Sequence, residues 1–227
     1  KTAKESKKSS ISAEDVYTLL DAYNIPTAGW HMASNAEDAV SSAAKIGYPV
    51  VIKADAAAIL HKSDMGGVAF DLKDADAVRA TVETMQQSFS EGDLSFFVQK
   101  YLPGGLELIM GAKSEEGLGH AVMFGLGGIF VEVMKDVTFH IAPITQEEAR
   151  QMLKSTKSYA LLKGVRGQAS VDIDAIATSL QRISQLVTDF PEITEMDINP
   201  FMVGKIGEDS IAADARITLS AGTVDDG

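Results

Sequence analysis

The sequence contains no cysteine, a single tryptophan and no apolar run of about 18 residues or more. The lack of cysteine excludes disulfides, thiolate nucleophiles and zinc sites built on cysteine. Without a long apolar run, no membrane-spanning helix is expected, and the polar start KTAKESKKSS has no apolar segment of the kind that a secretory signal needs. We therefore expect a cytoplasmic protein in a reducing compartment.

Positive charge is also scarce, because 20 Lys and Arg residues stand against 32 Asp and Glu residues, a formal net charge of −12. Binding to long nucleic acid depends on an excess of cations that neutralise phosphates. The acidic balance therefore argues against a nucleic-acid partner, but a local basic pocket can still bind one small phosphorylated molecule. The 227 residues, of which 45% are hydrophobic, suffice for one large domain or two tightly joined lobes.

Amphipathic segments and short apolar runs follow one another without a strict strand–helix alternation, which predicts an α+β fold. Apolar spacing predicts a helix behind Ser12, another from Asn35 to Gly47, and a helix behind a capping box of Thr145 and Glu148. Further helices are expected at 78–89, 159–163 and 173–187, and strands at 28–32, 49–55, 68–72, 95–102, 106–112, 120–124, 195–203 and 210–218. Residues 1–11 are expected to form a polar tether, residues 12–218 a domain of two lobes, the first spanning roughly 30–100, and residues 219–227 a tail.

Two polar features mark the first predicted lobe. Lys53 lies within the apolar strand VVIKAD, where it either points outward from a half-buried strand or meets a polyphosphate as a cation. The segment HKSDMGG, His61–Gly67, follows this strand. Its imidazole is suited to act as a base, a ligand or a phosphoryl acceptor, and its two glycines free backbone amides for phosphate oxygens. An ordinary turn is the alternative.

Two further features lie in the second predicted lobe. The loop GLGG, Gly125–Gly128, directly follows a strand; it is neither a Walker loop nor a dinucleotide fingerprint, and an ordinary tight bend is its alternative. In MDIN, Asp197 and Asn199 are two residues apart and so share one face of a strand, to which the next hairpin strand brings Asp214. Three hard oxygen ligands suit Mg²⁺, whereas the alternative is an acidic surface hairpin.

Several motifs occur in one order over almost all of residues 12–218: GYPVVIKAD, ILHKSDMGGV, FGLGGIFVEVMKD, IAPIT, EMDINP and AADARITL. Together they resemble the ATP-grasp (β-subunit) portion of ADP-forming acyl-CoA synthetases, of which acetate–CoA ligase is the best-known type. The resemblance implies an ATP-grasp fold, in which two α+β lobes with antiparallel sheets enclose the nucleotide. It also implies a reversible reaction that converts ATP, a carboxylic acid and CoA into ADP, phosphate and acyl-CoA through an acyl phosphate and phosphohistidines.

The resemblance further implies a role for each matching residue. His61 would carry the phosphoryl group, and Mg²⁺ would be held by Asn199 and Asp214 with Asp197 close by. The residues implied to bind ATP or ADP are Lys53, Lys62, Gln99, Lys100, Tyr101, Leu102, Glu107, Gly127, Gly128 and Glu132. Among these, Lys53 would contact the phosphates, residues 98–102 would line the adenine, and Glu107 would face the ribose.

The resemblance also implies a partner, because the CoA-binding Rossmann domain and the ligase domain of the family do not fit into 227 residues. We expect an alpha subunit or fused domains that carry these parts, in a hetero-oligomer of the heterotetramer type. One alternative is a non-catalytic regulatory module of a protein acetyltransferase, which the intact His61, Asn199 and Asp214 argue against. The other is the nucleotide subunit of a succinate–CoA ligase, which lacks the HKSDMGG segment.

Overall fold

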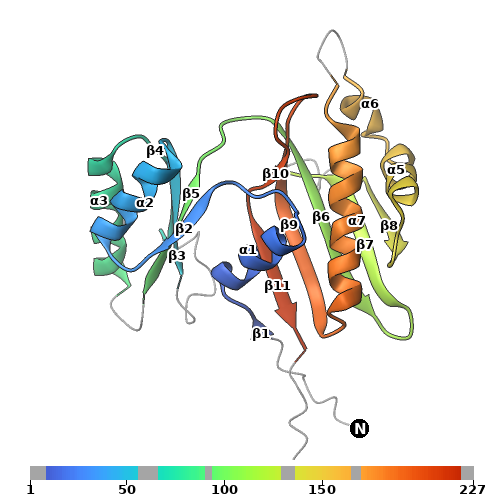
Figure 1. The fold of residues 1–227 in the computed structure, drawn as a ribbon, viewed down its shortest axis with the longest axis horizontal. Coiled ribbons are helices and arrows are strands. Elements are labelled where there is room, and N and C mark those ends of the chain that lie inside the picture. Colours follow the sequence, from blue (N-terminus) through green and yellow to red (C-terminus); the bar gives the residue numbers. More distant parts are fainter. Residues whose placement is uncertain (1–8, 56–65, 90–93, 129–135, 165–169, 221–227) are drawn as a thin grey trace, which may run out of the picture. The chain divides into compact units, whose positions relative to one another are not determined.

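The computed structural model describes residues 9–55, 66–89, 94–128, 136–164 and 170–220, which fall into two compact units (Figure 1). Unit 1 comprises residues 1–11, 15–26 and 105–227, and unit 2 comprises residues 12–14 and 27–104. Each unit has its own antiparallel sheet and its own helices. Within the described residues, no helix is long and apolar enough to cross a membrane.

Unit 2 is built on a four-stranded sheet in the order β2-β5-β3-β4, in which every neighbouring pair is antiparallel. Two helices, α2 and α3, pack against each other and against this sheet. The elements are β2 (Trp30–Ala33), α2 (Ala36–Ile46), β3 (Val50–Asp55), β4 (Val68–Leu72), α3 (Ala75–Ser88) and β5 (Ser95–Lys100).

The ends of α2 follow directly from the sequence. Asn35 accepts a hydrogen bond at 3.0 Å from the backbone N–H of Asp38, which satisfies a donor that the first turn leaves free. At the other end Gly47 has a φ of 86°, a left-handed conformation that favours glycine, and its N–H donates to Ala43. The expected helix from Asn35 to Gly47 is therefore confirmed, with a cap at each end.

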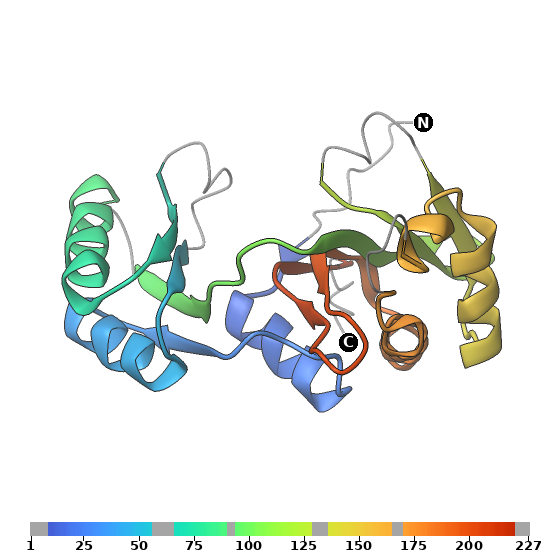
Figure 2. The same ribbon diagram turned by 90° about the horizontal axis from the view of Figure 1, so that it is seen from above.

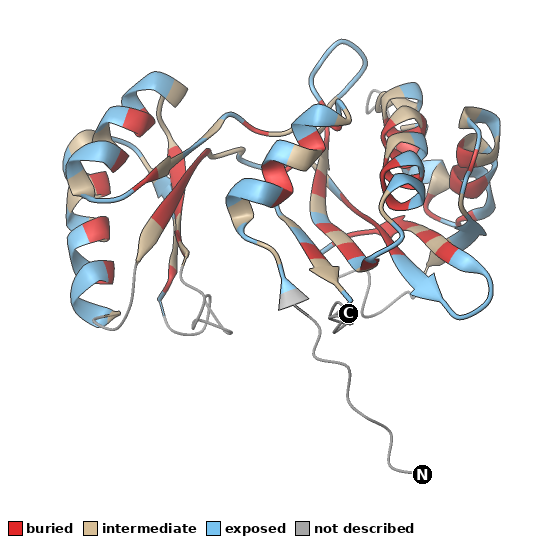
Figure 3. Ribbon diagram, turned by 60° about the horizontal axis from the view of Figure 1, so that its bottom comes forward, coloured by how far each residue is buried: buried red, intermediate tan, exposed pale blue. Residues whose placement is uncertain are grey.

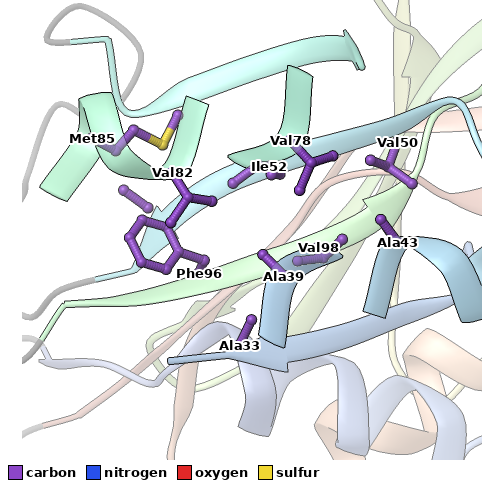
Figure 4. Packing of buried hydrophobic residues seen from close by; sticks show 11 residues of the cluster. Ala33, Ala39, Ala43, Val50, Ile52, Val78, Val82, Met85, Phe96 and Val98 are labelled. Atoms are coloured by element: carbon purple, nitrogen blue, oxygen red, sulfur yellow. The ribbon is translucent and has the colours of Figure 1, made fainter. Parts of the chain in front are cut away.

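Alternate residues of the small sheet form the core of unit 2. Val50, Ile52 and Ala54 of β3 and Phe96 and Val98 of β5 are buried against α2 and α3 (Figure 4). Because successive strand residues point to opposite faces, the intervening residues of the same strands lie on the face away from these helices. These intervening residues are Val51, Lys53, Phe97 and Gln99.

Unit 1 contains the larger sheet, whose strands run in the order β1-β11-β9-β6-β7-β8, with β10 paired to β9. Its helix α7 packs on β6 and β7, and α5 packs on α7. Figure 2 shows α1 on the same side of this sheet as α7. The elements are β1 (Ser9–Ser10), α1 (Ala13–Ala22), β6 (Leu106–Glu115), β7 (Gly119–Leu126), β8 (Val137–Ile141), α5 (Gln146–Ser155), α6 (Tyr159–Leu162), α7 (Ile173–Asp189), β9 (Ile193–Val203), β10 (Ile211–Ala212) and β11 (Ala215–Leu219).

Burial alternates along much of β7 and β9, whereas residues 108–112 of the central strand β6 are all buried (Figure 3). Met110 of β6 pairs with Phe124 of β7 and with Ile198 of β9, and all three side chains are fully buried on the α7 side. The alternate residues lie on the opposite face, which we call the outer face of the large sheet. The outer face therefore carries Asp197, and Gly111 lies directly beside it on β6.

The helix boundaries of unit 1 agree closely with the sequence-based expectations. Thr145 and Glu148 form the expected capping box at the start of α5, and α7 ends at Asp189, before Pro191. The strands agree less well: β8 was not predicted, and the strand expected at 210–218 is divided into β10 and β11. Ser9 and Ser10, within the expected tether, pair with Leu219 and Thr218 of β11. Pairing at a sheet edge uses backbone groups, so the polar side chains of this segment did not reveal it.

Candidate metal and nucleotide-binding residues

The predicted metal ligands of unit 1 lie on β9 and directly before its neighbouring strand β11. In the antiparallel ladder, Arg216 of β11 faces Asp197 of β9, and Ala215 faces Ile198. One step further, the backbone N–H of Asn199 donates to the carbonyl of Asp214 at 3.1 Å. Asp197 and Asn199 thus lie two residues apart on β9, and Asp214, directly before β11, is joined to Asn199 by a backbone hydrogen bond.

The electrostatic surroundings of Asp197 favour a cation. Burial, followed by the negative charges of Asp214 and Glu195, raises the pKa of Asp197, and the positive charge of Arg216 partly offsets this increase. A carboxylate that is partly desolvated beside a second carboxylate is stabilised when a cation binds between them. Two carboxylates and one amide oxygen are also hard ligands of the kind that Mg²⁺ prefers. The residues present therefore fit a magnesium ion.

This donor set differs from a closed metal cage made by protein side chains alone. Among the described residues, no three His, Cys, Asp or Glu side chains are grouped so that they could hold a metal ion. A magnesium ion at Asp197, Asn199 and Asp214 would therefore complete its coordination with water and phosphate oxygens. Mg²⁺ commonly binds in this way, through one or two carboxylates and the phosphates of its substrate.

Glu107 and the two glycines after β7 are also brought together in unit 1. The N–H of Gly127 donates to the carbonyl of Glu107 at 2.8 Å. A Cβ atom at Gly127 would lie 3.0 Å from the carbonyl carbon of Glu107, and one at Gly128 would lie 2.8 Å from its carboxylate Oε2. Gly128 also has a φ of 61°. Gly127 is therefore required for the close approach of its backbone to that of Glu107, and the positive φ of Gly128 favours glycine.

In unit 2, Lys53 lies on the face of the sheet away from α2 and α3. Its Nζ is 5.8 Å from the centroid of the Phe97 ring, within the range of a cation–π interaction. The same ring stacks on Trp30 at a centroid distance of 5.4 Å. Lys53 is partly exposed, as expected for a strand residue that points away from the core.

The other residues predicted to bind nucleotide in unit 2 do not share one position. Lys100 donates from Nζ to the carbonyls of Gly47 and Tyr48, at 2.9 and 2.8 Å, and so binds the C-terminal end of α2. Its neighbour Gln99 is buried on the other face of the sheet, and Tyr101 donates its N–H to Pro49. Lys100 therefore has a structural contact in this arrangement, and its contact with nucleotide stays a prediction.

Three predicted residues, His61, Lys62 and Glu132, lie outside the described residues, and Leu102 is partly buried just after β5.

The sequence analysis did not identify two features that lie beside the predicted residues. Arg216 shares the outer face with Asp214, and the two-residue alternation in AADARITL is the signal that would have identified it. The stacking of Trp30 on Phe97 joins β2 and β5 and has no local signal in the sequence.

The comparisons with known proteins place this geometry in a family. A family model described as "ATP-grasp domain" matches residues 2–219. The β subunit of acetate–CoA ligase (ADP-forming) I from Pyrococcus furiosus is 41% identical over 206 residues, 88% of either chain. The 4-hydroxybutyrate–CoA ligase (ADP-forming) of Nitrosopumilus maritimus is 42% identical over 95% of this chain, which spans only 32% of that ligase.

A solved structure gives the same result in three dimensions. Acetyl-coenzyme A synthetase 1 of Ca. Korarchaeum cryptofilum, in complex with coenzyme A and Mg-AMPPCP, matches with a TM-score of 0.82 and 36% identity over 92% of either chain. The fold class and family that the motifs implied are therefore confirmed. The chain belongs to the ATP-grasp family, in the group that contains the β subunits of ADP-forming acetate–CoA ligases.

Proposed function

We propose that the chain is the nucleotide-binding part of an ADP-forming acyl-CoA synthetase and transfers a phosphoryl group between ATP or ADP and His61. One observation supports this proposal: in a chain of this family, Asp197 and Asn199 lie two residues apart on β9, and Asn199 is hydrogen-bonded to Asp214 directly before β11. Phosphoryl transfer depends mainly on positioning and on neutralising charge, so a metal site is the part of the machinery that it needs first.

The chain's own residues have distinct roles in this proposal. The amide oxygen of Asn199 and the carboxylate of Asp214 hold Mg²⁺, with Asp197 beside them. The ion, when bound, neutralises negative charge on the phosphates. The imidazole nitrogen of His61 forms a bond to the terminal phosphorus as the bond to the leaving ADP oxygen breaks. A histidine carrier of this kind divides one difficult transfer into two easier ones. Lys53 would contact the phosphates, and the other residues predicted to bind nucleotide would hold the rest of ATP or ADP.

The remaining steps require a partner. The Pyrococcus furiosus relative is named as one subunit of its ligase, and the Nitrosopumilus maritimus relative is about three times as long as the segment matched here. We therefore infer that an alpha subunit or fused domains supply CoA binding and the ligase step, in a hetero-oligomer. The complete reaction forms acyl-CoA, ADP and phosphate from a carboxylic acid, CoA and ATP.

A thermal unfolding experiment tests the metal dependence of nucleotide binding. A ligand present at about 100 times its dissociation constant stabilises a protein by about 2.7 kcal/mol. Because 1 kcal/mol corresponds to about 2–4 °C in a chain of this size, ADP with Mg²⁺ should raise the melting temperature by roughly 5–10 °C. The same ADP with excess EDTA should raise it far less, and Mg²⁺ alone is the control for a metal effect without nucleotide. An equal increase with EDTA would contradict the proposed metal site.

A further inference from the structure

Arg216 is an exposed cation on the outer face of the large sheet. It faces Asp197 directly across the β9–β11 ladder, and it follows Asp214 by two residues, so the three side chains share one face. The guanidinium therefore lies within electrostatic reach of the residues proposed to hold the metal.

Within the described part of the chain, Arg216 forms no ion pair at or below 4.0 Å, unlike Arg79 with Glu37 and Arg150 with Asp174. A guanidinium presents five N–H donors in a planar fork. These donors remain available to a ligand that approaches the outer face.

The neighbouring strand β6 adds no side chain beside Asp197. Asp197 pairs with Arg216 on one side and with Gly111 of β6 on the other. Gly111 carries no side chain, so β6 contributes only backbone to this row of the outer face. The side chains of this row are therefore one carboxylate and one guanidinium with available donors.

We propose that Arg216 binds the β- and γ-phosphate oxygens of the nucleotide, beside the metal ion held by Asn199 and Asp214. This inference rests on the proposed function. The fork of an arginine matches phosphate geometry and can donate two parallel hydrogen bonds. Asp197, directly across the ladder, would orient the guanidinium by its charge and so act as a positioning residue for Arg216.

Isothermal titration of the full chain with Mg-AMPPCP and with AMP tests this role. AMPPCP does not transfer its terminal phosphoryl group, and AMP lacks the two phosphates that Arg216 would contact. Arg216→Gln should weaken Mg-AMPPCP binding by about 10–100-fold, as expected for the loss of hydrogen bonds to a charged group. Arg216→Lys should recover part of this loss, because lysine keeps the charge but not the fork. AMP affinity and melting temperature should remain near wild type.

Lys113→Gln is the matched control, because Lys113 is a second exposed cation on the outer face, one row away opposite Glu195. It should change Mg-AMPPCP affinity by about twofold or less, as is usual for a remote surface charge. An unchanged affinity in Arg216→Gln, or an equal loss for AMP, would overturn the role of Arg216.

Asp214→Asn separates the proposal about Arg216 from the proposed metal site. If Asp214→Asn weakens Mg-AMPPCP binding and Arg216→Gln does not, only the inference about Arg216 fails, whereas wild-type affinity in both would overturn the metal site too.

Discussion

Asp214→Asn is expected to slow the transfer of label from [γ-³²P]ATP to the protein by about 100-fold or more. The substitution keeps the shape of the side chain and removes the negative charge, so a magnesium ion bound as we propose would lose a charged ligand beside Asn199. A metal ion contributes several kcal/mol to the stabilisation of charge in the transition state, and each 1.36 kcal/mol is a factor of ten in rate. The rate is measured at several Mg²⁺ concentrations, and a partial recovery at high Mg²⁺ would show that the loss lies in metal binding.

Glu195→Gln provides the matched control for this experiment. Glu195 is an exposed carboxylate on β9, two residues before Asp197 and opposite Thr218 rather than beside Asn199. Its removal changes the net charge of the chain by the same amount as Asp214→Asn. We expect near wild-type labelling from Glu195→Gln. Similar rates in the two variants would show that general charge, and not a specific ligand, determines the effect.

Gly111→Ala is expected to lower the melting temperature by roughly 3–10 °C. A Cβ atom at Gly111 would lie 2.3 Å from the carbonyl oxygen of Met196, and this backbone atom cannot rotate away as a side chain can. Overpacking of this kind costs about 1–3 kcal/mol, and 1 kcal/mol corresponds to about 2–4 °C in a chain of this length. The displaced strand also carries Asp197, so Mg-ADP should stabilise the variant less than wild type.

The control for this prediction is Gly29→Ala, in which the new Cβ atom meets nothing closer than Ile46 at 4.0 Å. It changes the unfolded chain in the same way, because alanine restricts the backbone at both positions. Calorimetric unfolding of the two variants therefore isolates the steric contribution. Equal melting temperatures would mean that β6 and β9 do not approach each other at Gly111 as the structure shows.

The local features of this fold were accessible from the sequence because they depend on residues close along the chain. The capping box of Thr145 and Glu148 requires only a three-residue spacing, and the end of α2 at Gly47 requires one glycine. The candidate metal ligands Asp197 and Asn199 follow from the two-residue period of a strand, and Asp214 follows from the hairpin. In each case a short spacing, a single residue or one hairpin determines the arrangement.

The features that could not be predicted depend on strand pairing over long distances. Only the approach of β7 to β6 explains why Gly127 and Gly128 must be glycines beside Glu107. The contact of Lys100 with the end of α2 joins residues about fifty positions apart, whereas the family resemblance implied that residues 98–102 line the adenine. Strand β8 was missed because it is short and exposed on most of its residues, and so lacks the buried alternation that identifies a strand.

The most direct test of the account is to locate the phosphoryl group after the full chain has been incubated with Mg-ATP. Mass spectrometry under conditions that preserve phosphohistidine should place the group on His61. His61→Ala should take up none, while His140→Ala, which removes an exposed histidine on β8, should be labelled as wild type. Phosphoryl transfer to another residue, or undiminished labelling of His61→Ala, would contradict the proposed role of the chain as a phosphoryl carrier.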